Sequence, residues 1–163
     1  GDPISLLIDK NDNEEVLFFK IYEQDKEFLI TSSAGKGFFV NSNDFIASTK
    51  SGKKVMNLKD NDRAVSCAEK KGDLIVSLSG EKKSLKLLAF NSSEIPNMQK
   101  GRGVTLQKFK SGKTLNAFCA DSNEGIINER SKKVLLSAKD LKKWLGKRAQ
   151  AGRIEPKNLH SKI

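Results

Sequence analysis

The chain has 163 residues, which is enough for one domain with a hydrophobic core or for a few repeats that share one. It contains 30 Lys and Arg against 20 Asp and Glu, for a formal net charge of +10 at pH 7. No apolar run approaches the ~20 residues of a membrane-spanning helix, which argues against an integral membrane protein. Cys67 and Cys119 lie in apolar segments without metal-ligand spacing, and we predict that both are buried free thiols of a cytosolic protein.

The positive charge is unevenly distributed along the chain. Residues 1–46 contain four bases and nine acids, a net charge of −5, whereas residues 47–163 contain 26 bases and 11 acids, a net charge of +15. A general solubilising excess would be spread more evenly. The later part of the chain is therefore expected to bind a polyanion, with nucleic acid as the first candidate and acidic proteins or anionic membranes as alternatives.

The first elements indicate that the chain begins inside a repeating unit. Ile4 stands 51 residues before Val55 and resembles the end of an earlier glycine loop. Asp9 to Glu15 is expected to form an acidic turn, and the apolar run from Val16 to Ile21 predicts a buried strand. A strand at this position would lack the partner that it has in a longer parent protein.

Two hairpins are predicted next, one in each of the first two units. Phe28 to Thr31 and Phe38 to Val40 are apolar runs on either side of a glycine-containing turn. Asp73 to Ser77 and Leu85 to Phe90 are separated by a turn at Gly80 that also carries lysines. Short apolar runs bounded by glycine and polar residues are typical of antiparallel strands.

The third unit repeats this order and ends in a helix. A basic turn separates two short apolar runs within Gly125 to Leu136. Ser137 is a predicted N-cap for a short helix from Ala138 to Leu145. Trp144 is interpreted as a packing anchor, with stacking on a nucleobase as the alternative. Residues 157–163 are predicted to be a disordered tail.

A loop of glycine and basic residues recurs at a period near 50. Val55 and Val104 end two such loops 49 residues apart, and Gly101 and Gly152 are 51 residues apart. This period, with short strands in each unit, is typical of propeller blades or solenoids. Because glycine has no Cβ and tolerates positive φ, these loops can present cations close to an anionic backbone. We predict a mainly β chain with repeats at roughly 1–58, 59–109 and 110–156.

The units and loops resemble the C-terminal DNA-wrapping domains of bacterial type IIA topoisomerase A subunits. The resemblance is carried by Lys53 to Leu58, by Gly101 to Val104 and by Trp144 to Arg153, which are similar to alphaproteobacterial topoisomerase IV A subunits. It implies an open β-pinwheel, a propeller-like arc of about three four-stranded blades that exchange strands, with a short helix near the C-terminus. The long glycine-rich box of gyrase A subunits is absent, which favours the topoisomerase IV form.

The resemblance also implies a non-catalytic role for this chain. In the family, the catalytic tyrosine and the Mg²⁺-binding acids belong to other segments of the A subunit, while ATP binds a separate B subunit. No catalytic residue, metal site or cofactor is therefore expected here. The expected protein partners are the ATPase B subunit and the remainder of the A subunit, in a cytoplasmic, nucleoid-associated heterotetramer with no membrane partner.

Sequence-independent binding of duplex DNA is the predicted function, because the candidate cations lie on loops and turns that reach phosphates and not base edges. The predicted contacts are Lys36, Lys50, Lys53, Lys54, Lys83, Lys86, Lys100, Arg102, Lys147, Arg148 and Arg153, with the loop glycines Gly52, Gly101, Gly103 and Gly152. The alternative is a propeller-like interaction module whose basic rim docks on an acidic protein partner.

Overall fold

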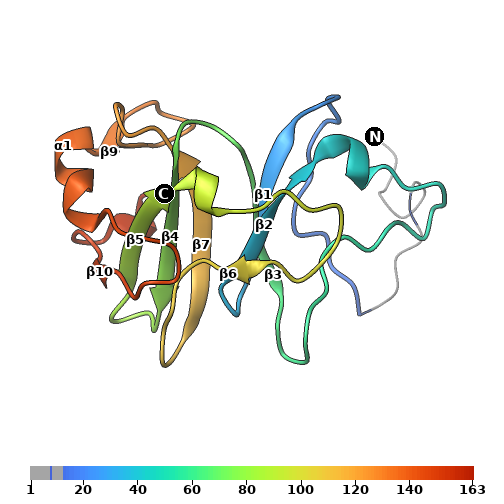
Figure 1. Ribbon diagram of the computed structural model, residues 1–163, viewed down its shortest axis with the longest axis horizontal. Helices are drawn as coiled ribbons and strands as arrows, with labels where there is room; N and C mark the ends of the chain where they lie inside the picture. The colour runs from blue at the N-terminus through green and yellow to red at the C-terminus, as the bar shows by residue number, and fades with distance from the viewer. Residues whose placement is uncertain (1–7, 9–12) are drawn as a thin grey trace.

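The computed structural model describes residue 8 and residues 13–163 and forms two four-stranded antiparallel sheets and a two-stranded sheet (Figure 1). The first sheet has the order β3-β1-β2-β6, with β1 (Glu27–Ser32), β2 (Lys36–Asn41), β3 (Ala64–Glu69) and β6 (Val104–Thr105). The second has the order β10-β5-β4-β7, with β4 (Leu74–Gly80), β5 (Lys86–Asn91), β7 (Lys113–Ala120) and β10 (Arg153–Ile154). The third pairs β8 (Ile126–Ile127) with β9 (Val134–Leu136).

Each four-stranded sheet combines strands of neighbouring repeats. The hairpin β1–β2 belongs to the first repeat, whereas β3 and β6 on its two edges come from the second repeat. In the same way, β7 and β10 of the third repeat flank the hairpin β4–β5 of the second. This exchange confirms the mainly β pinwheel arrangement. The third sheet differs from the expected four-stranded blade because the residues after β9 form a helix and return to the second sheet as β10.

Alternation along β4 joins the sheets through two hydrophobic cores. Val76 and Leu78 face a core that also contains Ile126 and Leu141 from the third repeat. The intervening Ile75 faces a second core that contains Leu29 and Phe39 of the first sheet. Because successive side chains of a strand point to opposite faces, the second sheet is buried on both sides. The sheets therefore pack as consecutive layers along the arc.

The expected helix is confirmed. α1 (Ala138–Leu141) continues into a 3₁₀ turn (Lys142–Trp144), and the Ser137 hydroxyl accepts a hydrogen bond from the Asp140 amide at 3.1 Å. Leu141 is buried, as expected for a helix whose apolar residue faces the core. A serine cap satisfies one of the amides that the first helical turn leaves without a partner.

The prediction of a disordered tail at 157–163 is wrong. Leu159 is 2% exposed and packs in the same core as Leu141, within a 3₁₀ turn (Leu159–Ser161). The Glu155 carboxylate accepts the His160 backbone amide at 3.1 Å and also contacts the His160 ring nitrogen Nδ1. The tail is ordered because the Leu159 side chain reaches a core.

The buried strand predicted from Val16 to Ile21 is also not formed. These residues have no strand conformation, and Phe19 and Ile21 are 77% and 86% exposed. At the repeat period, this run corresponds to β3 and β7, each of which pairs with the hairpin of the preceding repeat. Within the described residues, no sheet edge pairs with the run. Ile4 and Asp9 to Asp12 of the expected acidic turn lie outside the described residues.

The two cysteines are free but only half-buried, whereas full burial was expected. Burial raises the pKa of both the Cys67 and the Cys119 thiol, which keeps them protonated at neutral pH. Cys67 pairs with Ile30 across the first sheet, and Cys119 pairs with Ile75 across the second. Both therefore act as small apolar strand residues.

Candidate nucleic-acid interface

The three glycine and basic loops are joined to one another by equivalent backbone hydrogen bonds. The Gly101 amide donates to the Val55 carbonyl at 3.0 Å, and the Asn57 amide donates to the Gly101 carbonyl at 2.8 Å. One repeat later, the Ala149 amide donates to Leu106 at 2.8 Å, and the Lys108 amide donates to Gln150 at 3.0 Å. We call the combined segments 50–57, 100–108 and 147–153 the loop ribbon. Loops that are about 50 residues apart in the sequence are thus consecutive in space.

Two glycines hold the loop ribbon against the sheet edges. Gly103 and Gly152 have φ values of +86° and +79°, and a Cβ at either position would collide with the carbonyl of Gly37 in β2 or of Leu87 in β5. Gly103 is therefore the structural counterpart of Gly152, 49 residues apart. The sequence comparison that matched Gly101 with Gly152 is displaced by two residues. A side chain at these sites would both strain the backbone and push the loop off the strand.

Lys36 and Arg148 meet at Thr105, where the two four-stranded sheets adjoin. The Lys36 Nζ donates to the Thr105 hydroxyl at 2.7 Å, and the Arg148 Nη1 donates to the Thr105 carbonyl at 2.9 Å. Both cations are half-buried, and their positions are fixed by these bonds. Among the described residues, neither side chain has an acidic partner, so the charge that they bring to the junction is held in place by Thr105.

Most of the other predicted contacts are exposed. Arg102 is the exception: it is half-buried, and its Nε is buried without a hydrogen-bond partner among the described residues. It does not stand at the tip of an open turn, because Gly101 is hydrogen-bonded to the loop segment 55–57 and Gly103 lies against the Gly37 carbonyl of β2. The exposed contacts are Lys50, Lys53, Lys54, Lys83, Lys86, Lys100, Lys147 and Arg153.

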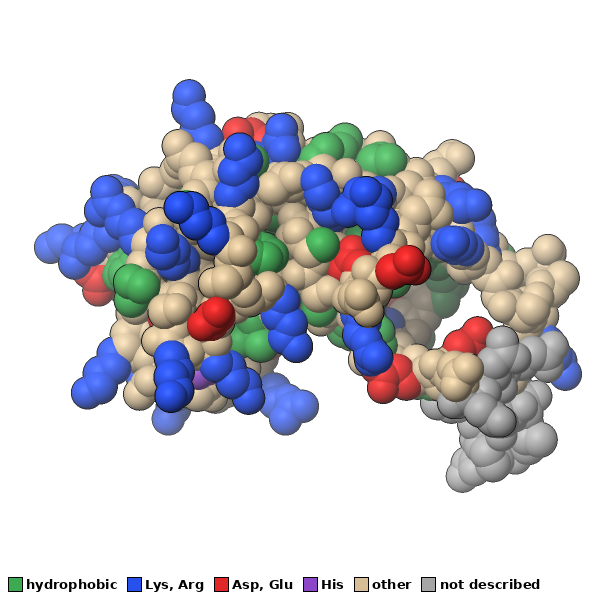
Figure 2. Space-filling view, turned by 90° about the horizontal axis from the view of Figure 1, so that it is seen from below, with side chains coloured by type: hydrophobic (Ala, Val, Ile, Leu, Met, Phe, Trp, Pro, Cys, Tyr) green, Lys and Arg blue, Asp and Glu red, His purple; other side chains and the backbone are tan. Residues whose placement is uncertain are grey.

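None of the eleven predicted contacts forms an ion pair with another described residue. The Lys and Arg residues that do form ion pairs there lie outside this set: Lys26, Arg63, Lys70 and Lys143. Figure 2 shows Lys and Arg side chains spread across one face of the molecule, with few acidic side chains between them. The predicted contacts therefore carry charge that the protein itself does not compensate.

The structure places some of the predicted contacts apart from the loop ribbon. Lys83 lies in the turn between β4 and β5, and Lys86 begins β5 opposite Ile154. Lys36 and Lys86 are counterparts, since Lys36 begins β2 opposite Thr105 in the same register. These residues extend the basic surface from the loop ribbon to the ends of the central hairpins.

Two residues of the interface were missed from the sequence. Lys108 is exposed at the end of the second segment of the loop ribbon, and its backbone amide joins that segment to the third. Gln107 is buried, and its Nε2 donates to the carbonyls of Lys86 at 3.0 Å and Ala151 at 2.9 Å. The repeat period places Lys108 at the end of a glycine and basic loop, because it stands 51 residues after Asn57, which ends the preceding loop. No local pattern reveals a glutamine that ties the loop at Ala151 to the start of β5.

The described residues include no group of three or more His, Cys, Asp or Glu side chains that could hold a metal ion. None of the described helices is long and apolar enough to traverse a bilayer. The exposed cations lie on loops and strand ends, which reach phosphate oxygens but do not enter the major groove as a helix does. Chemically, this surface is suited to charge neutralisation along an extended polyanion.

Comparisons with known proteins agree with the fold. Residues 26–68 and 89–118 match the family described as "DNA gyrase C-terminal domain, beta-propeller". The chain is 44% identical over 158 residues to the A subunit of DNA topoisomerase 4 from Rickettsia bellii, and 41% identical over 160 residues to that from Rickettsia felis. These alignments cover 96% and 98% of this chain but only 20% and 21% of the relatives, so the chain spans about a fifth of their length.

Solved structures show the same architecture. The Escherichia coli ParC C-terminal domain superimposes with a TM-score of 0.78 at 21% identity, over 97% of this chain and 67% of that one. A DNA gyrase A C-terminal domain superimposes with a TM-score of 0.69 at 25% identity, over 97% of this chain and 55% of that one. Together with the sequence matches and the exchange of edge strands, these likenesses establish that the chain belongs to the family of C-terminal β-pinwheel domains of DNA gyrase and topoisomerase IV A subunits.

Proposed function

We propose that this chain is a non-catalytic domain that binds and bends duplex DNA on its basic outer rim, without reading sequence. In the parent topoisomerase IV A subunit, it would help to select and present the DNA segment for strand passage. The observation that carries the proposal is that the eleven predicted contacts form no ion pair with a described residue, while the three loops that bear eight of them are joined into one ribbon.

The physical argument concerns desolvation and counterions. A cation that is already paired must lose its partner before it can bind a phosphate, whereas an unpaired exposed cation needs only to shed water. Each phosphate neutralised also releases condensed counterions, which favours binding at low salt. The loop ribbon offers unpaired cations from two neighbouring sheets. A polyanion that follows it would contact both sheets at once.

The parent protein is proposed from the relatives, which are A subunits of DNA topoisomerase 4. On this basis the whole protein is a type II DNA topoisomerase that uses Mg²⁺ at residues outside this chain and ATP bound to a separate B subunit. The ATPase B subunit and the remainder of the A subunit would be its protein partners. The assembly would act in the cytoplasm, on the nucleoid.

The test is the salt dependence of binding to duplex DNA. The chain would be titrated against a fluorescently labelled duplex of about 30 base pairs at several KCl concentrations, with anisotropy as the signal. We expect log K to fall linearly with log[KCl], with a slope of about −4.5 to −7 if five to eight phosphates are neutralised. Unrelated duplexes of equal length should compete about equally, and a pre-bent duplex should compete better than a linear one.

A protein-interaction module with a basic rim is the competing outcome. In that case, an acidic protein should displace the duplex at equal charge concentration and should bind more tightly at physiological salt. A salt slope near zero for the duplex would contradict DNA binding through the loop ribbon.

A further inference from the structure

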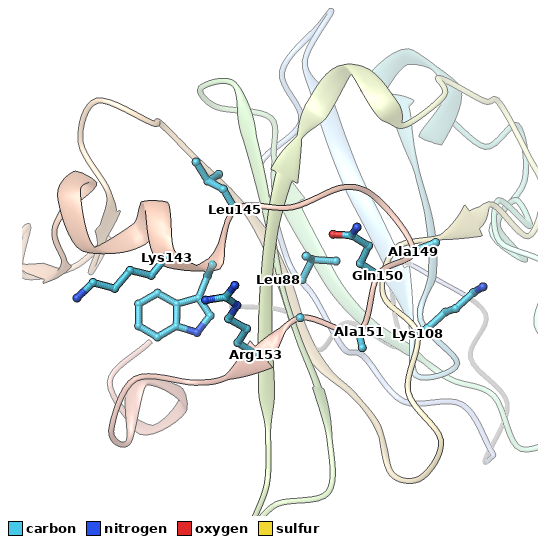
Figure 3. A pocket seen from close by; sticks show the side chains of 10 residues that line it. Leu88, Lys108, Lys143, Leu145, Ala149, Gln150, Ala151 and Arg153 are labelled. Carbon is cyan, nitrogen blue, oxygen red and sulfur yellow. The ribbon is translucent and has the colours of Figure 1, made fainter.

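We infer that a hollow beside Trp144 binds an unpaired DNA nucleotide, with its base on the indole and its phosphates on the surrounding cations. The inference rests on the proposed function for the identity of the ligand, DNA, and extends it from duplex to unpaired strand. The hollow has a volume of about 550 Å³, within the range of about 300–1,000 Å³ of small-ligand pockets. Its apolar lining includes Leu88, Trp144 and Leu145, and its cations are Lys108, Lys143 and Arg153 (Figure 3).

The walls of the hollow are preformed. The Trp144 Nε1 donates to the Ile154 carbonyl at 2.9 Å, which closes the loop from 145 to 153 into a ring. The Gly146 amide donates to the Ala89 carbonyl of β5 at 2.8 Å, and the Gln107 Nε2 holds the Ala151 carbonyl at 2.9 Å. A site that is already held by such bonds loses little conformational entropy when a ligand enters.

Trp144 has a double role in this arrangement. It is half-buried and packs against the core that contains Leu141, so the interpretation as a packing anchor agrees with the structure. Its one N–H group is used by Ile154, so what it offers to the hollow is ring surface. Lys143 and Arg153 line the same hollow as the indole. An aromatic surface flanked by cations is the arrangement that single-strand-binding proteins use to stack a base and hold its phosphates.

The corresponding place in the first sheet is filled instead. Phe38 of β2 is the counterpart of Leu88 of β5, 50 residues apart. Val55, Met56 and Met98 pack against the cluster that contains Phe38. The position that corresponds to Trp144 is Ile95, which is 6% exposed in a hydrophobic core. The hollow is therefore a local departure from the repeat and not a feature of every blade.

Charge identifies the ligand class. Lys108 and Arg153 form no ion pair with another described residue, and Lys143 pairs with Asp140 at 3.5 Å on the surface. Among the residues that the structure describes, no acidic side chain lines the hollow. Lys108 and Arg153 also belong to the loop ribbon, so a strand that leaves a bound duplex would enter the hollow. Bases of intact duplex are stacked inside the helix, and only an unpaired base can reach the indole.

Trp144 is the only tryptophan of the chain, so its fluorescence reports directly on the hollow. The chain would be titrated with an oligothymidine of about ten nucleotides, with an abasic oligonucleotide of the same length and with intact duplex. We expect oligothymidine to change the fluorescence saturably, while the abasic strand and the duplex change it little at equal phosphate concentration. Equal changes with oligothymidine and the abasic strand would overturn the inference, because the bases would then contribute nothing.

A pair of matched variants tests the residue itself. Trp144→Leu should weaken binding of labelled oligothymidine about tenfold more than it weakens binding of the duplex, because stacking contributes about 1–3 kcal/mol per base. Phe19→Leu removes an exposed aromatic ring that does not line the hollow, and it should change neither the oligothymidine affinity nor the duplex affinity. If oligothymidine fails to affect Trp144 while the duplex still binds, the hollow is refuted and the proposed function stands. If the duplex fails to bind while oligothymidine still exceeds the abasic strand, the proposed function is refuted and the hollow stands.

Discussion

Lysines beside the ends of β1 and β3 and lysines of the loop ribbon are used differently. At the end formed by the first sheet, Lys26 bonds to Glu69 at 3.2 Å and to Glu23 at 3.3 Å, and Lys70 bonds to Glu27 at 3.2 Å. Hydrogen bonds that the Lys26 ammonium donates to Glu69 and Glu23 raise the pKa of Lys26, as expected for a cation held by acids. Along the loop ribbon, the cations have no such partners among the described residues. Lysines of the first kind serve the fold, and those of the second kind are free to serve a partner.

Two hollows in the described part of the molecule differ in the same way. The hollow at the first sheet is lined by Phe18, Ile21 and Phe45, with Lys20 and Glu23 as its only charged residues among those described. Their charges cancel, and the remaining lining is mainly apolar. The hollow at Trp144 has three cations and no acid among the described lining residues. An apolar hollow suits protein packing, whereas a cationic one suits a nucleic acid.

The largest effect is expected from changing the glycine that seats the loop ribbon on the first sheet. Gly103→Ala should lower the free energy of unfolding by about 2–4 kcal/mol, because the positive φ is strained for alanine and the Cβ collides with the Gly37 carbonyl. Gly52→Ala is the matched control. Its φ is +86°, but a Cβ there would meet nothing within 4 Å, so about 1 kcal/mol is expected. Chemical denaturation measures both, and equal losses would mean that the sheet contact is unimportant.

The next effect contrasts the two kinds of lysine directly. Changing Lys100 and Arg153 to alanine should weaken duplex binding by about 1–3 kcal/mol and make the salt slope less negative by about one to two. The control removes two cations from the first-sheet end, Lys20 and Lys70, whose Nζ atoms lie over the rings of Phe28 and Phe39. Anisotropy titrations should show little change for the control. If both double variants lose the same affinity, the positive charge acts only as a diffuse field.

Local signals account for the part of this fold that was predictable from sequence. The inner hairpins, the Ser137 cap and the period near 50 all follow from residues that are close in the sequence. The same period is visible in the turn caps: Asn41 accepts the Asn43 amide, and Asn91 accepts the Ser93 amide, both at 2.9 Å. Such features depend on short-range geometry and need no knowledge of the partner strand.

The edges could not be predicted because their partners are remote. β6 and β10 have two residues each, and the bond from Lys36 to Thr105 joins residues that are 69 positions apart. The run from Val16 to Ile21 has strand composition, but composition does not supply a sheet edge to pair with. For the interface, the cationic loops were evident. Their joining into one ribbon, the clamp at Gln107 and the half-burial of Arg102 depend on tertiary packing.

A smaller effect is expected from a single lysine of the first-sheet end. Lys70→Ala removes an ion pair with Glu27 and a cation that lies 4.6 Å from the centre of the Phe39 ring. Each such contact at a partly exposed site contributes about 0.5–1 kcal/mol, so the free energy of unfolding should fall by about 1 kcal/mol. Thermal denaturation at low and high salt would separate the two contributions, since salt weakens the ion pair more. If Lys70→Ala leaves the stability at low salt unchanged, the ion pair between Lys70 and Glu27 does not stabilise the fold.

The smallest effect is expected from two carboxylates, one beside each four-stranded sheet, whose protonation at low pH should weaken the fold. In the second sheet, the Ser122 hydroxyl and amide bond to the Asp73 carboxylate at 2.7 and 2.8 Å and hold its pKa below the usual value. In the first sheet, burial of Asp62 favours a higher pKa, but hydrogen bonds from the Ser33 hydroxyl and the Ala34 amide outweigh it, so the pKa is again lowered. Both carboxylates tie a loop to its neighbour.

The sign of the pH dependence follows from these directions. A carboxyl with a lowered pKa in the folded state stabilises the fold above its unfolded pKa of about 3.9, and this stabilisation disappears as the pH falls through the folded value. Asp73→Asn should therefore lower the melting temperature at pH 6 and flatten its decline below about pH 4. Asp62→Asn should do the same for the first sheet. Melting curves from pH 6 to pH 2 measure both, and a decline as steep in the double variant as in the parent chain would assign acid sensitivity to other carboxylates.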